Sequence, residues 1–100
     1  MGNVTFKTYD QLDQEKLENW RGSAKCSKFQ AKAALKAVGR LQEAKDLIAS
    51  LPEDDDVRLA WEEAIEFRRN SPTLLAMAEQ MGMTDEELDQ LFEQAIKIEA

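Results

Sequence analysis

The stretch that decides the fold is residues 71–96, SPTLLAMAEQMGMTDEELDQLFEQAI. It begins with Ser71 and Pro72, a capping side chain followed by a proline at the first position of a helix. Gly82 supplies the left-handed residue that ends a helix. Apolar residues at helical spacing lie between these signals, namely Leu74, Leu75, Ala78 and Met81. The pattern therefore predicts a short helix over residues 72–81.

A second helix follows the glycine. Thr84 and Glu87 form a capping box, in which each side chain satisfies the other residue's backbone N–H. The helix is expected to bury Leu88, Leu91, Phe92, Ala95 and Ile96. The spacing Ala78-x3-Gly82-x5-Leu88 is that of a helix-turn-helix. A DNA-reading helix would direct Asp85, Glu86, Glu87 and Asp89 at phosphates, which basic side chains are needed to neutralise. The spacing therefore indicates a helical corner used for packing or protein contact, without direct binding of nucleic acid.

Outward from this pair, similar signals predict further helices. A helix over residues 10–21 is expected to end at Gly22, and another starts at the capping box of Ser27 and Gln30. Gly39 makes either a corner between two helices or a kink in one, and the acidic turn 53–56 caps a helix over residues 55–69. The predicted inward-facing residues are Leu12, Leu17 and Trp20; Phe29, Ala33, Ala34, Ala37 and Val38; Leu41, Ala44, Leu47, Ile48 and Leu51; and Val57, Trp61, Ala64 and Ile65, with Phe67 off the last stripe.

These elements amount to an all-α fold, a compact bundle of five to six short helices with an extended N-terminal arm. The arm comprises residues 1–9 and a single helical domain comprises residues 10–100. The segment 4–9 is rich in β-branched and aromatic residues and has no evident partner strand, so it either packs on the helices or pairs only with another chain. The second alternative would give a homo-oligomer. The 100 residues, 43% of them hydrophobic, suit one modest core.

Charge is distributed unevenly along the chain, whose net charge is −7. Residues 20–45 hold seven basic residues and one acidic residue, whereas the second half is acidic. Lys28, Lys32, Lys36 and Arg40 recur every four residues and are expected on one helix face. This face is interpreted as a solvated surface, as a partner of the acidic half, or as a docking strip for an acidic protein. Nucleic acid is disfavoured, because no aromatic side chains accompany the lysines to stack on bases.

The chain is poor in the residues on which nucleophilic catalysis and zinc binding usually depend. The chain has no histidine and one cysteine, Cys26, so a nucleophilic dyad and a zinc site both lack their usual groups. The run 53–56 lacks the alternation and the glycine of a calcium loop. No apolar run approaches the length of a membrane span. We therefore expect no enzyme activity, no metal, no cofactor and no membrane partner.

Three stretches resemble a known group of proteins. They are Trp61-Glu62-x-Ala64-x-x-Phe67-Arg68-Arg69-x-Ser71-Pro72, then Ala78-x-x-x-Gly82-Met83-Thr84-Asp85-x-x-Leu88-Asp89-x-Leu91-Phe92, and, upstream, Ser27-Lys28-Phe29-Gln30-Ala31-Lys32-Ala33-Ala34-Leu35. Together they resemble small proteins of tailed phages and prophages that are encoded among tail or tail-fibre genes. The resemblance covers about residues 24–98 and carries no defined activity. It implies a phage protein acting in the host cytoplasm or in the virion.

The function expected from these observations is a protein-interaction module. It would be a tail component or assembly factor that binds a phage structural protein. The alternative is an acidic inhibitor of a host nucleic-acid-binding enzyme or defence complex, whose carboxylates imitate phosphates. The expected contact residues are Lys28, Lys32, Lys36 and Arg40 on the basic strip and Asp85, Glu86, Glu87 and Asp89 on the acidic helix.

Overall fold

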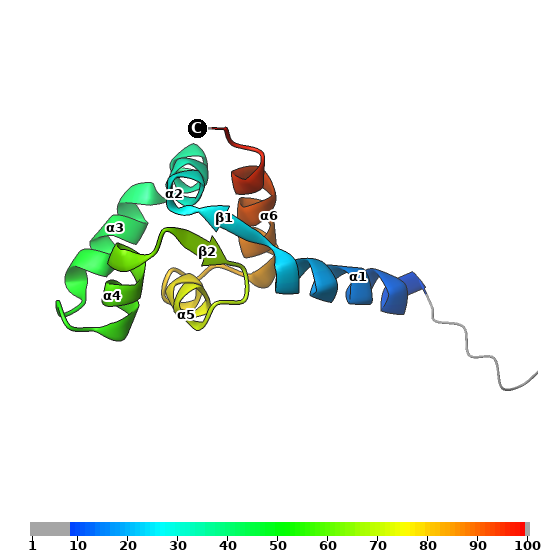
Figure 1. Cartoon of the computed structure of the whole chain (residues 1–100), viewed down its shortest axis with the longest axis horizontal. Helices are drawn as coiled ribbons and strands as arrows, with labels where there is room; N and C mark the ends of the chain where they lie inside the picture. The colour runs from blue at the N-terminus through cyan, green and yellow to red at the C-terminus, as the bar shows by residue number, and fades with distance from the viewer. Residues whose placement is uncertain (1–8, 100) are drawn as a thin grey trace, which may run out of the picture.

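The structure, a computed structural model, describes the backbone of residues 9–99 and the side chains of residues 13–99. The elements in chain order are α1 (Tyr9–Ser23), β1 (Lys25–Ser27), α2 (Lys28–Ala37), α3 (Leu41–Ser50), α4 (Asp56–Glu63), β2 (Glu66–Arg68), α5 (Pro72–Gln80) and α6 (Asp85–Ile96). The predicted helical bundle is confirmed, with six helices over these residues (Figure 1). The predicted arm lies outside them, apart from Tyr9, which begins α1.

The helix starts follow the local capping chemistry. Ser27 and Thr84 both form complete capping boxes, with Gln30 and Glu87 as their partners. Ser71 accepts a hydrogen bond from the backbone N–H of Leu74. These caps confirm the predicted starts of α2, α5 and α6, because each satisfies N–H groups that the helix itself leaves unpaired.

Two glycines end helices in the left-handed conformation. Gly39 has φ +76° and Gly82 has φ +68°. Gly39 therefore separates α2 from α3 as two helices, which decides between the two predicted forms. Gly22 behaves differently, since α1 continues through it to Ser23, and the expectation that it stops this helix is wrong.

A short two-stranded ribbon was not expected from the sequence. Strand β1 pairs antiparallel with β2, with Cys26 opposite Phe67. The predicted helix 55–69 is therefore wrong in its last part, because α4 ends at Glu63 and Ala64 is already extended at ψ 140°. Phe67 gives the physical reason, since it lies off the helical stripe and a continued helix would leave it outside the core. In the strand it is 3% exposed and stacks on Trp61 with ring centroids 4.8 Å apart.

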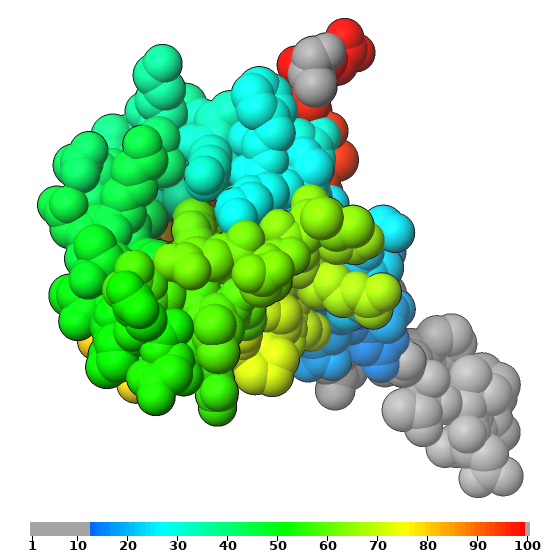
Figure 2. Space-filling view, turned by 60° about the vertical axis from the view of Figure 1, so that its left-hand side comes forward, coloured from blue at the N-terminus to red at the C-terminus, as the bar shows by residue number. Residues whose placement is uncertain are grey.

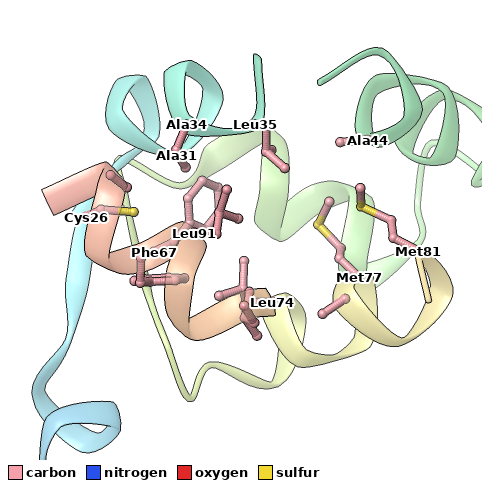
Figure 3. Close-up of a cluster of buried hydrophobic side chains, with 14 of the residues drawn as sticks. Cys26, Ala31, Ala34, Leu35, Ala44, Phe67, Leu74, Met77, Met81 and Leu91 are labelled. Carbon is pink, nitrogen blue, oxygen red and sulfur yellow. The ribbon is translucent and has the colours of Figure 1, made fainter. Parts of the chain in front are cut away.

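The core is formed mainly by α2, α5, α6 and the ribbon, as Figure 3 shows. Its fully enclosed large side chains include Phe92 and Leu88 of α6. The predicted apolar face of α2 is rotated from the observed one, since Ala31, Ala34 and Leu35 are buried. Phe29, Ala37 and Val38 are exposed, because α2 turns its alanine-rich face to α6 and leaves them outside this contact.

Four other predicted core residues are also exposed, namely Leu17, Ile65, Leu75 and Ile96. Ile65 is 83% exposed because it lies in the turn between α4 and β2 that the predicted longer helix omitted. On α5, Met77 is buried, whereas Leu75, which was predicted to be buried, is exposed. The predicted apolar set of α3 is confirmed, since Ala44 and Ile48 are buried and Leu41, Leu47 and Leu51 pack against the core.

Helix α1 extends away from the rest of the structure (Figure 1). The particle measures 61 × 29 × 22 Å, and this helix accounts for its length. Six of the seven residues 13–19 are exposed, whereas Trp20 packs against the core. Within residues 13–23, it is therefore the C-terminal end of α1 that packs against the other elements.

Candidate functional site

The predicted basic strip is divided by the corner at Gly39. Lys28, Lys32 and Lys36 belong to α2, whereas Arg40 lies beyond it, at the start of α3. The Arg40 guanidinium donates to Glu43 and to the carbonyl oxygen of Met81, and it lies 3.6 Å from a Glu87 carboxylate oxygen. Arg40 therefore holds α3 to α5 and α6, and the strip keeps only its three lysines.

Two of these lysines border an open groove with cations from other helices. Lys28 and Lys32 of α2 face Lys45 of α3 and Arg58 of α4 around a volume of about 260 Å³. Ile48, Ala49 and Trp61 complete its lining together with Glu62. Figure 2 turns toward the viewer the side of the molecule on which α2, α3 and α4 meet. We call this feature the basic groove and define it by Lys28, Lys32, Lys45 and Arg58.

Two cations of the basic groove are held in place by the protein. Lys28 Nζ donates to the carbonyl oxygen of Glu62 over 2.9 Å. Arg58 donates to the Glu62 carboxylate over 2.9 Å and to the carbonyl oxygen of Leu51 over 2.7 Å. These contacts fix the α4 side of the groove and leave one carboxylate among four cations.

The other two cations are available to a ligand. Within residues 13–99, neither Lys32 nor Lys45 makes a hydrogen bond or ion pair with the protein. A carboxylate or phosphate that entered the groove could accept hydrogen bonds from both ammonium groups. Single exposed ion pairs contribute only about 0–1 kcal/mol, so binding would depend on several cations acting together.

Sequence reasoning missed Lys45 and Arg58 because they lie on other helices than the predicted strip. Their association with Lys28 and Lys32 depends on the corner at Gly39 and on the packing of α4 beside α3. Spacing along one helix cannot reveal it. The positive balance of residues 20–45 was the available signal, since it includes Lys45.

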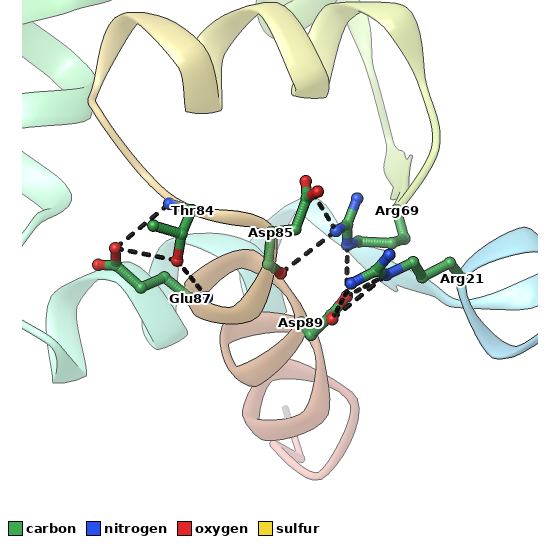
Figure 4. Close-up of polar contacts among 6 residues, drawn as sticks. All are labelled: Arg21, Arg69, Thr84, Asp85, Glu87 and Asp89. Atoms are coloured by element: carbon green, nitrogen blue, oxygen red, sulfur yellow. Dashed lines mark hydrogen bonds and ion pairs between the residues drawn. The ribbon is translucent and has the colours of Figure 1, made fainter. Parts of the chain in front are cut away.

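The acidic end of α6 differs from the prediction at Asp89. Asp89 was expected to be exposed, but it is 7% exposed and lies between two arginines (Figure 4). Arg69 Nε donates to Asp89 Oδ1 over 2.8 Å, and Arg21 Nη2 donates to Asp89 Oδ2 over 2.6 Å. Asp89 lies on the side of α6 that faces Arg69, the residue after β2, and Arg21, near the end of α1. It is therefore unavailable to a partner.

The charge state of Asp89 is determined by these two arginines. Burial raises the pKa of its carboxyl group, but the hydrogen bonds and the attraction from Arg21 and Arg69 outweigh burial. The pKa of Asp89 therefore lies below its usual value, and the carboxylate is charged at neutral pH.

Two of the other three predicted acidic contacts are also engaged within the protein. Asp85 lies 3.6 Å from Arg69 and accepts a hydrogen bond from it at its backbone carbonyl, although its side chain is 74% exposed. Glu87 completes the capping box of Thr84 and approaches Arg40 (Figure 4). Glu86 is exposed. The start of α6 thus serves mainly to hold the helices together.

Arg69 pairs with carboxylates of α6 and does not lie at the end of a helix, because α4 already ends at Glu63. Arg68 is exposed on the ribbon, opposite Lys25.

Among residues 13–99 no three metal-binding side chains come together, and no helix of the described chain is long and apolar enough to cross a membrane. Cys26 is buried opposite Phe67, and burial raises the pKa of its thiol to about 11. No protein-family model matches this chain, and no curated protein or solved structure is significantly similar to it.

Proposed function

We propose that this chain is a non-catalytic protein-interaction module that binds an acidic segment of a protein partner in the basic groove. The observation that carries the proposal is the convergence of four cations from three helices on one groove, in a chain whose net charge is −7. A positively charged groove on a negatively charged protein attracts an acidic surface and repels a basic one.

The lining of the groove favours a protein segment over nucleic acid. Trp61 is 5% exposed and stacked on Phe67, so it offers no open ring face to a base. The negative charge of the remaining chain opposes a long polyanion that would extend beyond the groove. A volume of about 260 Å³ suits a few acidic side chains better than a duplex.

The resemblance to small proteins of tailed phages supports one class of partner. On that basis we propose a structural protein of the phage tail, which the module would meet in the host cytoplasm or in the virion. The module would then act as a tail component or an assembly factor.

The alternative function, phosphate mimicry by the acidic end of α6, has less support. A mimic needs a cluster of carboxylates that a basic surface can reach. Asp89 is buried, and Asp85 and Glu87 already have arginine neighbours. Glu86 alone among the four is exposed without such a neighbour within residues 13–99.

Charge reversal at the two available lysines tests the proposed function. The variant Lys32→Glu/Lys45→Glu is compared with the control Lys25→Glu/Lys97→Glu, which changes the net charge equally at exposed sites outside the groove. A labelled ten-residue glutamate peptide and a glutamine peptide of the same length serve as probes in fluorescence anisotropy. The same variants are then used to capture purified tail proteins.

The proposal requires three results. The glutamate peptide should bind more tightly than the glutamine peptide, and the groove variant should bind it at least ~10-fold more weakly, because two favourable pairs become repulsive. The control variant should stay within about twofold of the parent. Equal weakening by both variants would show that net charge alone matters and would overturn the proposal, as would equal binding of the two peptides.

A further inference from the structure

Residues 13–19 of helix α1 are largely exposed. The helix is 15 residues long, a length at which an isolated helix is marginal in water. The part from Asp13 to Asn19 is exposed except at one residue of intermediate burial, and Leu17 is 37% exposed. Amphipathic helices gain most of their stability from packing, and residues 13–19 gain little of it from the other residues that the structure describes.

The C-terminal end of α1 is anchored by hydrogen bonds, which fix the direction of the helix. Arg21 Nε and Nη2 both donate to the carboxylate of Asp89 on α6, and the N–H of Ala24 donates to the carbonyl oxygen of Trp20. The chain then enters β1 directly. Helix α1 therefore points away from the basic groove, and Figure 1 shows it on the opposite side from α3 and α4.

The two separated features are complementary in charge. Residues 10–19 hold four carboxylates and one lysine, whereas the basic groove holds four cations and one carboxylate. Asp13 and Glu18 are exposed on α1, and Lys32 and Lys45 are available in the groove. Ala49, which is exposed in the groove beside the buried Ile48 and Trp61, offers Leu17 of a second copy a small apolar contact.

We propose that α1 of one chain docks in the basic groove of a second copy, so that the protein assembles head to tail. This inference rests on the proposed function, since it uses the same groove and names a second copy as its acidic partner. The helix and the groove are different surfaces at opposite ends of a particle 61 Å long. Contacts of this heterologous kind build open rows or rings of copies rather than closed twofold dimers.

Two blocked variants test the proposal. Lys32→Glu/Lys45→Glu reverses the charge of the groove and keeps the helix, whereas Asp13→Asn/Glu18→Gln removes two carboxylates from the helix and keeps the groove. Each is studied alone and in an equimolar mixture by sedimentation velocity from 10 μM to about 1 mM at low salt. Circular dichroism and urea denaturation of each variant verify that it is folded.

The expected results follow from the head-to-tail geometry. The unmodified chain should exceed the monomer mass of 11.4 kDa increasingly with concentration and should not level off at twice that mass at the highest concentrations. Each blocked variant alone should stay at the monomer mass. Their mixture should form a complex of two chains and no larger species, because only one intact helix and one intact groove remain per pair.

Other outcomes overturn the inference without affecting the proposed function. A parent chain that remains monomeric up to about 1 mM, or a mixture that forms no complex of two, would exclude docking of α1 in the groove. Binding of the glutamate peptide by the Asp13→Asn/Glu18→Gln variant would then show that the groove still accepts an acidic segment. Failure of the parent chain to bind the glutamate peptide would instead contradict the proposed function.

Discussion

Arg69 Nε donates a hydrogen bond to Asp89 Oδ1 over 2.8 Å, and the Arg69 side chain is only 2% exposed. This pair joins the ribbon to α6, and Arg21 adds the end of α1 to the same carboxylate. Three elements that are distant in sequence thus depend on one acidic side chain. Because a buried arginine without its counter-charge is costly, Asp89 is expected to matter for stability rather than for binding.

The first prediction concerns the loss of this carboxylate. Asp89→Asn should lower the free energy of unfolding by about 3 kcal/mol, because the buried Arg69 would keep only the more distant and exposed carboxylate of Asp85. Urea denaturation measures the change. The matched control is Glu86→Gln on the exposed side of α6, which should change stability by less than about 0.5 kcal/mol. Similar small effects at both positions would contradict the structural role of Asp89.

The second prediction concerns pH. The pKa of Asp89 is lowered in the folded protein, so its contribution is complete above the pKa of the unfolded chain, about 3.9, and is lost as the pH falls through the folded pKa. The stability difference between the parent chain and Asp89→Asn should therefore be constant near pH 6–7 and decrease below about pH 4. Urea denaturation of both proteins at each pH isolates this carboxylate from the others. A difference that grew with acidity would contradict the lowered pKa.

The third prediction concerns Cys26. Burial raises the pKa of its thiol from the ordinary value of 9.0 to about 11, which lowers the thiolate fraction at pH 8 by roughly 100-fold. Labelling with a disulfide reagent should therefore be at least ~100-fold slower than for the control Cys26→Ser/Ser23→Cys, which moves the thiol to an exposed position. Equal rates for the two thiols would show that Cys26 is accessible.

The fourth prediction compares the same substitution at two glycines. Gly82→Ala should cost about 1 kcal/mol, because an L side chain is strained at φ +68° even though nothing lies within 4 Å of the added Cβ. Gly22→Ala should stabilise by about 0.5–1 kcal/mol, because Gly22 lies inside α1 and has open space around it. Thermal unfolding of the two variants should give shifts of opposite sign, and shifts of the same sign would contradict these backbone conformations.

Features of the fold that depend on neighbouring residues could be predicted from the sequence. The capping boxes at Ser27 and Thr84 and the proline start of α5 each involve side chains within three residues, so their chemistry is complete in a short window. Gly39 and Gly82 ended helices for the same local reason.

Features that depend on tertiary packing were missed. Phe67 is drawn into a strand by its contact with Trp61 and by the opposite strand at Cys26, neither of which a helical period can show. The observed face of α2 is selected by α6. The contact residues of the candidate site also depend on tertiary packing. Arg40 and Asp89 are unavailable to a partner because they form ion pairs within the protein, and Lys45 lies in the groove although it belongs to another helix than the predicted strip.

The position of α6 in the chain has a consequence for how the protein is made. This helix supplies Leu88, Leu91, Phe92 and Ala95 to the core and also the carboxylate that neutralises Arg69 and Arg21. The other helices of residues 9–99 are synthesised first. Until residues 85–96 have been synthesised, α2 lacks the helix with which it makes its most extensive contact, and Arg69 lacks the Asp89 carboxylate that compensates its burial. The core therefore completes its packing only when α6 is present, and the earlier segments remain accessible to proteases and chaperones until then.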